Sequence, residues 1–171
     1  MNYAILIGQI LGGINVILGF LSYQTKTAKK LLFLQVLTAL LFCIHYFLIG
    51  AISACVLNLI AFIRNAVYAN RDKKIFSYRF YPILFAVIMA IAGILSWQNI
   101  YSILVILGLV INTLCLPFKN PQNIRKSILV SSSMVLMYNI AVFSIGGAVY
   151  ESVVILSSII GLFRYRKYKE Q

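Results

Sequence analysis

The sequence predicts an all-α membrane protein with seven transmembrane helices, arranged as three helices, one inverting helix and three further helices. Two observations lead to this prediction. Of the 171 residues, 62% are hydrophobic and 11% are charged, against about 45–50% and about 25% in soluble domains, so lipid must solvate much of the chain. The fifteen Lys and Arg residues also fall in or close to alternate connections between apolar stretches.

The apolar stretches are divided by short polar breaks. A spanning helix takes about 20 mostly apolar residues and tolerates about 17. Gly50 marks a tight turn, the run 70–77 is a polar loop, and Pro82 lies in a first helical turn, where proline is tolerated. Trp97 and Tyr101 bracket another turn and suit an interfacial position. We expect helices over 4–22, 31–49, 51–69, 78–96, 102–118, 126–145 and 148–163.

The basic residues predict the orientation. The connections around Gly50, Gln98 and Gly146 carry no Lys or Arg. Because short loops rich in positive charge stay in the cytoplasm, we expect the N-terminus outside and the C-terminus in the cytoplasm. Anionic lipid headgroups would contact the clusters, which explains the net charge of +12 without nucleic acid. The clusters are Lys26, Lys29 and Lys30; Arg64, Arg71, Lys73, Lys74 and Arg79; Lys119, Arg125 and Lys126; and Arg164, Arg166, Lys167 and Lys169.

The start of the chain resembles a spanning helix rather than a leader. It has neither a basic n-region nor a small-residue cleavage site, so we expect the first apolar stretch to be retained.

An internal repeat is visible when the sequence is shifted against itself by 96 positions. Gly12 then meets Gly108, Gly50 meets Gly146, and two basic pairs coincide. We therefore expect a first repeat over 1–75, an inverting linker helix over 76–98 and a second repeat over 99–171. Some transporters use such parallel repeats, although duplication of a purely structural bundle would look the same.

Several short motifs resemble the YgjV-type family of bacterial inner-membrane proteins. They are Gly8-Gln9, the run 23–27 (Tyr-Gln-Thr-Lys-Thr), His45-Tyr46, and the stretch 58–65 ending in Arg64-Asn65. The resemblance implies a multi-pass protein of the bacterial inner membrane.

A more distant resemblance connects the layout to the PQ-loop and SWEET sugar-transporter architecture. That family has Pro-Gln at the end of its first helix, an aromatic-Gly end to its second and an asparagine in its third. Here Gln24 follows Tyr23 without the proline, His45-Tyr46 precedes Gly50, and Asn58 lies in the third stretch. In the second half Pro117 lies at the end of the fifth stretch, and Pro121-Gln122 follows in the loop. At the 96-residue offset Val154 stands where a second asparagine would match. The resemblance implies transport of a sugar-like solute.

Polar residues inside the apolar stretches are the candidate site, because such groups in hydrocarbon need a partner or a cavity. Gln35, Thr38, Phe42 and His45 share one helical face. Asn58 lies near the expected midplane, and His45 lies roughly 7 Å from the outer surface. The expected cavity residues are Asn15, His45, Asn58, Asn112 and Asn139, with Gln35, Arg64, Asn65 and Tyr138 as secondary candidates.

Each of these residues also has a structural interpretation. Asparagines join membrane helices through hydrogen bonds, and a histidine can bond a neighbouring helix. We expect Arg64 to extend its charge to the headgroups. Glu151 is assigned to the solvated outer side, so no pair with Arg64 is expected. Gly8 and Gly12 form a GxxxG motif for close helix contact, inside the bundle or in a homo-oligomer.

Two functions remain open at the level of sequence. The first is a carrier or facilitator for a small solute, sugar-like ones included, with a polar cavity at the midplane. The second is a non-transporting scaffold or accessory subunit. We expect no enzyme, because one histidine and three acids form no catalytic arrangement. We also expect no cofactor or metal, since Cys43, Cys55 and Cys115 have no metal-ligand spacing.

Overall fold

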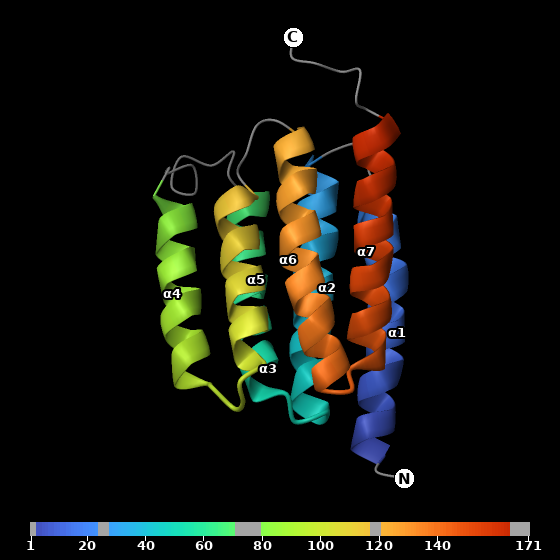
Figure 1. Ribbon diagram of the computed structural model, residues 1–171, viewed down its shortest axis with the longest axis vertical. Coiled ribbons are helices and arrows are strands. Elements are labelled where there is room, and N and C mark those ends of the chain that lie inside the picture. The colour runs from blue at the N-terminus through green and yellow to red at the C-terminus, as the bar shows by residue number, and fades with distance from the viewer. Residues whose placement is uncertain (1–2, 24–27, 71–79, 117–120, 165–171) are drawn as a thin grey trace.

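The computed structural model describes residues 3–23, 28–70, 80–116 and 121–164, which form seven α-helices and contain no strand (Figure 1). Three helices are long and apolar enough to cross a membrane, over Tyr3–Ser22, Ile52–Ala69 and Ile145–Phe163. The helices are α1 Tyr3–Tyr23, α2 Ala28–Leu48, α3 Ile52–Ala69, α4 Tyr81–Leu95, α5 Ser102–Cys115, α6 Pro121–Ala141 and α7 Ile145–Arg164.

The helix bounds agree with the expected stretches to within three residues, except at α6. This helix begins at Pro121 and ends at Ala141, about four to five residues before the expected 126–145. Proline at a first helical position loses no hydrogen bond and has its φ already set for the helix, so the polar start at Pro121 can be helical. Hydropathy alone places the start too late, since it counts only the apolar part.

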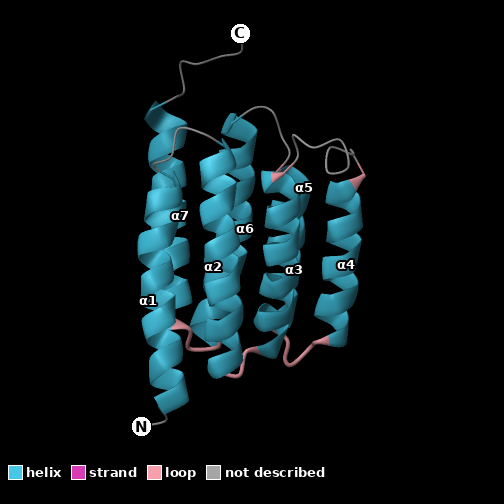
Figure 2. Cartoon of the chain, turned by 180° about the vertical axis from the view of Figure 1, so that it is seen from behind, coloured by secondary structure: helices cyan, strands magenta, loops and turns pink. Residues whose placement is uncertain are grey.

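The helices pack side by side along the long axis of the molecule. Each packs on the next in the chain, α7 closes on α1, and α4 packs on both α3 and α5. Figures 1 and 2 show α4 to α7 on one side and α1 to α3 on the other. The connections without Lys or Arg gather at the end where α1 begins, and α7 ends at the opposite side. Nine of the fifteen Lys and Arg residues lie outside the described residues, so the orientation stays a prediction.

The α2–α3 and α6–α7 hairpins have the same turn, 93 positions apart. Helices α2 and α6 begin and end 93 residues apart. Gly50 and Phe143 hold positive φ angles of 78° and 54°. The turn bonds also correspond: Ile49 N to His45 O with Val142 N to Tyr138 O, Gly50 N to Phe47 O with Phe143 N to Ile140 O, and Ala51 N to Tyr46 O with Ser144 N to Asn139 O.

This correspondence corrects the expected register of 96 for the hairpins. The earlier register paired Gly50 with Gly146 because both are glycines, whereas the structural partner of Gly50 is Phe143. Backbone conformation places a residue in a turn, and here a phenylalanine adopts the left-handed conformation that glycine adopts in the other hairpin. Aligning the two hairpins by residue identity alone therefore gives an offset that is three positions too long.

A glutamine from a neighbouring element holds each hairpin turn in the same way. Gln98, in the α4–α5 connection, donates to the Gly50 carbonyl at 3.0 Å and accepts from the Ser53 N–H at 3.2 Å. Gln9 of α1 makes two equivalent bonds of 2.9 Å and 3.3 Å to the other turn. Its partners are the Phe143 carbonyl and the Gly146 N–H. All four bonds, two from Gln98 and two from Gln9, lie at the same end of the bundle.

The glycines of α1 allow close packing inside the bundle. A Cβ placed on Gly12 would lie 2.8 Å from the Gly146 Cα, and one on Gly8 would lie 3.1–3.4 Å from the end of α2. The GxxxG motif therefore serves contacts of α1 with α2 and α7 within one chain. Gly13, on another face, has open space around it.

Candidate functional site

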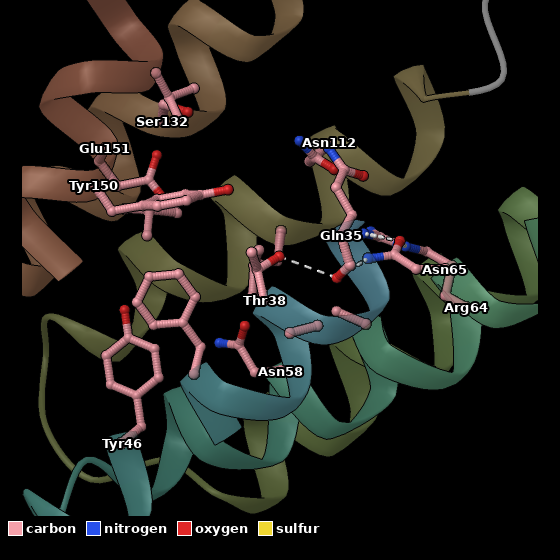
Figure 3. Close-up of a pocket in the computed structure, with 16 residues that line it drawn as sticks. Gln35, Thr38, Tyr46, Asn58, Arg64, Asn65, Asn112, Ser132, Tyr150 and Glu151 are labelled. Atoms are coloured by element: carbon pink, nitrogen blue, oxygen red, sulfur yellow. Dashed lines mark hydrogen bonds between the residues drawn. The ribbon is translucent and has the colours of Figure 1, made fainter. Parts of the chain in front are cut away.

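A cavity of about 90 Å³ lies inside the bundle, between α2, α3, α5, α6 and α7 (Figure 3). None of its lining residues comes from α1 or α4. The side chains that give it polar character are Gln35, Thr38, Tyr46, Asn58, Arg64, Asn65, Asn112, Ser132, Tyr150 and Glu151.

Helix geometry places this cavity in the middle of the bundle. At 1.5 Å per residue, Asn58 and Glu151 each lie about 9 Å below the start of their helices. Asn112 lies about 15 Å below the start of α5, and Arg64 about 18 Å below the start of α3. All three helices start at the same end of the molecule (Figure 1). The cavity therefore reaches the depth of a bilayer midplane, about 15 Å from each surface.

Two of the five principal candidates, Asn58 and Asn112, line the cavity from different helices. Asn58 donates its Nδ2 to the Ala54 carbonyl at 2.9 Å, which leaves its Oδ1 as an acceptor. Asn112 makes no side-chain hydrogen bond to any residue that the structure describes. Both amides therefore have hydrogen-bonding capacity to offer a ligand.

Arg64 lies inside the bundle, so the expectation that it reaches the headgroups is wrong. Its side chain is 3% exposed. Its Nε and Nη2 donate to the Asn65 Oδ1 at 3.1 and 2.9 Å, and its Nη1 donates to the Thr113 hydroxyl. Asn65 in turn donates to the Gln35 carbonyl at 3.2 Å. Hydrogen bonds to side chains of α3 and α5, and through Asn65 to α2, stabilise the guanidinium in the interior.

Glu151 also lines the cavity and is half-buried, which corrects its assignment to the solvated outer side. Ser132 of α6 lines the same cavity. In the 93-residue register, Glu151 of α7 occupies the position that Asn58 occupies in α3. The residue matching Asn58 is therefore Glu151 and not Val154, because the earlier register was three positions too long.

His45 lies outside the cavity and joins three elements. Its Nδ1 is 2.6 Å from the Gly8 carbonyl and its Nε2 is 2.7 Å from the Ser144 hydroxyl. These bonds connect α2 with α1 and with the α6–α7 turn. The side chain is fully buried. Its two ring nitrogens are thus occupied by protein partners, as in the structural interpretation of this residue.

Three further candidates are buried but do not line the cavity. Asn139 accepts a bond of 2.6 Å from the Tyr46 hydroxyl, while its Nδ2 has no partner. Tyr138 is 1% exposed and belongs to the apolar core. Asn15 is fully buried, and neither polar atom of its side chain is hydrogen-bonded. Equal depth in the bundle does not bring these residues to one space.

Aromatic rings form one wall of the cavity. The Phe42 and Tyr150 rings are 4.9 Å apart and nearly perpendicular, and Phe42 and Tyr46 stack at 5.6 Å. A Cβ on Gly19 would overlap the Tyr150 ring, so this glycine makes room for the wall. The rings restrict the space beside the polar groups.

Comparison with known proteins places the chain in a family. The model of the Imp-YgjV family, described as "Bacterial inner membrane protein", matches residues 6–169. The chain belongs to the Imp-YgjV family. No curated protein and no solved structure matches it. It is accordingly a multi-pass protein of the bacterial inner membrane, while the similarity to the PQ-loop and SWEET architecture stays a prediction.

Sequence reasoning missed four polar side chains of the site in this Imp-YgjV protein, Tyr46, Ser132, Tyr150 and Glu151. The 93-residue register would have found Glu151 as the partner of Asn58, whereas Ser132 pairs with Ala39, which was not a candidate. The polar face of α2 was a usable signal, since Gln35, Thr38 and Phe42 all line the cavity.

The Imp-YgjV chain offers no arrangement for binding a metal within its described residues. No group of three His, Cys, Asp or Glu side chains lies together there. Cys43 and Cys55 are free thiols with their sulfur atoms 3.6 Å apart, and Cys115 is also free.

Proposed function

We propose that this protein is a non-enzymatic carrier or facilitator for a small polar solute. The observation on which the proposal rests is that amides from both halves of the chain, Asn58 and Asn112, line one cavity at midplane depth. Parallel-repeat transporters hold their substrates at such a position, between the repeats. The proposed repeats are 1–75 and 99–171, connected by the inverting helix in 76–98, with the N-terminus outside.

Correspondence of the lining residues supports the two repeats. Four pairs, each 93 positions apart, line the same cavity. They are Ala39 with Ser132, Phe42 with Val135, Asn58 with Glu151, and Ala61 with Val154. A site between two related halves is expected to have such pairs, whereas polar contacts that only join neighbouring helices are not.

The mechanism we propose is alternating access by rocking of the two halves. At the end that we assign to the outside, Gln9, Gln98 and His45 hold the turns of both hairpins. The described helices are thereby tied together on that side of the cavity. Opening to the outside would require some of these bonds to break.

Uptake into proteoliposomes tests the proposal. Wild-type protein and the variants Asn58→Ala and Asn112→Ala are compared across a panel of radiolabelled small solutes, with Leu59→Ala on the exposed face of α3 as the matched control. We expect uptake of at least one solute above empty liposomes, reduced in both asparagine variants and unchanged in the control. If no solute enters faster than into empty liposomes, the carrier proposal is wrong.

A scaffold or accessory role is the second candidate. His45 and Asn139 favour it, because their hydrogen bonds join helices outside the cavity. The scaffold role predicts a stable complex with another membrane protein and no solute uptake. Affinity purification of the tagged chain from its native membrane, followed by mass spectrometry, distinguishes the two.

A further inference from the structure

The cavity lining holds one cationic and one anionic side chain. Arg64 comes from α3 in the first half of the chain, and Glu151 comes from α7 in the second. The guanidinium is bonded to Asn65 and Thr113 and forms no ion pair with Glu151. Two opposite charges therefore border the same space without neutralising each other directly.

Each charge has capacity left for a ligand. A guanidinium has five N–H donors, and Arg64 directs at least three of them to neutral oxygens. A carboxylate is the acceptor that best matches a guanidinium, because the two form charge-assisted bonds. The Glu151 carboxylate lines the same cavity, and a carboxylate has about four lone-pair sites. An ammonium group could donate to them.

The environment increases the need for such partners. Unpaired charges at bilayer depth are costly, and they usually face a water-filled cavity or each other. Arg64 lies about 9 Å deeper than Glu151 along parallel helices, so the charges stand at different levels of the cavity. A solute with a negative group at one end and a positive group at the other would neutralise both.

We infer that the solute is a small zwitterion of the amino-acid class, with its carboxylate on Arg64 and its ammonium on Glu151. This inference rests on the proposed carrier function. The volume of about 90 Å³ agrees with it. A water needs about 10–15 Å³ by this measure, so the cavity has room for about six to nine waters, or for a solute with a similar number of non-hydrogen atoms. Alanine is of this size, and a hexose is larger.

The test is uptake of four radiolabelled solutes into proteoliposomes, with the leak into empty liposomes subtracted. Alanine is the zwitterion, lactate replaces its ammonium by a hydroxyl, ethanolamine has an ammonium without a carboxylate, and glucose is a neutral sugar. The variants are Arg64→Gln and Glu151→Gln, with Arg64→Lys as the charge-preserving control and Val130→Ala on the exposed face of α6 as the remote control.

We expect alanine to enter fastest, with its uptake reduced about tenfold or more in each glutamine variant, because each loses one charge-assisted contact. Arg64→Lys should retain part of the uptake, and Val130→Ala all of it. Should a variant fail to fold, thermal unfolding of the wild type in detergent provides a second measurement. Alanine should raise its melting temperature, and lactate and glucose should not.

The outcomes separate this inference from the proposed function. Uptake of glucose, lactate or ethanolamine as fast as alanine would overturn the zwitterion and keep the carrier. Alanine uptake that is insensitive to both glutamine variants would overturn the assignment of the two charges. No uptake of any solute would overturn the carrier itself.

Discussion

Replacing His45 by alanine tests whether this residue holds the bundle together. The change removes the bonds of 2.6 Å to the Gly8 carbonyl and 2.7 Å to the Ser144 hydroxyl. Interhelical hydrogen bonds in membranes average about 0.6 kcal/mol, so the two bonds account for about 1 kcal/mol. A buried polar group left without a partner adds about 1–3 kcal/mol, and the buried Ser144 hydroxyl is such a group once the His45 ring is removed. We therefore expect a loss of about 2–4 kcal/mol in the free energy of unfolding.

The assay is reversible unfolding in mixed micelles titrated with SDS, followed by circular dichroism. The matched control is Ile44→Ala, since Ile44 precedes His45 on α2 and is 41% exposed. Folded His45→Ala protein should keep its solute uptake in proteoliposomes, because the side chain does not line the cavity. A loss of stability no larger than that of Ile44→Ala would refute this reasoning, and so would abolished uptake in a variant of unchanged stability.

Two further predictions use the same unfolding assay. Gly12→Ala should destabilise the protein by about 1–3 kcal/mol, as overpacking does, because its Cβ would lie 2.8 Å from the Gly146 Cα. Gly13→Ala, whose Cβ meets nothing within 4 Å, should be neutral or stabilising, and equal effects would contradict the packing described. Gln9→Ala and Gln98→Ala should each cost about 1 kcal/mol, since each loses two interhelical bonds. A cost confined to one of them would argue against equivalent hairpins.

The helices were predictable from sequence because lipid requires long apolar stretches, and these leave a strong signal. The ends of the helices were harder to predict, as Pro121 shows, because a polar first turn resembles a loop in the sequence. A repeat was also predicted, but matching Gly50 to Gly146 gave the hairpins the wrong register. The turn is defined by backbone conformation, which Phe143 adopts without being a glycine.

The candidate site was predictable only in part. Asn58 and Asn112 were found because an amide in an apolar stretch is conspicuous, and both line the cavity. His45 was equally conspicuous but faces α1 and the α6–α7 turn, and sequence does not show which way a helix is rotated. Glu151 was missed because it lies near the start of the last expected helix, 148–163, where we expected solvent to be its partner.

The central claim is that water and solute reach a polar cavity at the midplane. Accessibility of introduced cysteines in proteoliposomes tests it most directly, after Cys43, Cys55 and Cys115 have been replaced by alanine. We predict that a charged, water-soluble thiol reagent labels Asn58→Cys and Asn112→Cys, that a transported solute slows this labelling, and that Leu107→Cys on the exposed face of α5 stays unlabelled. If neither cavity cysteine is labelled while the protein is folded, the account is contradicted.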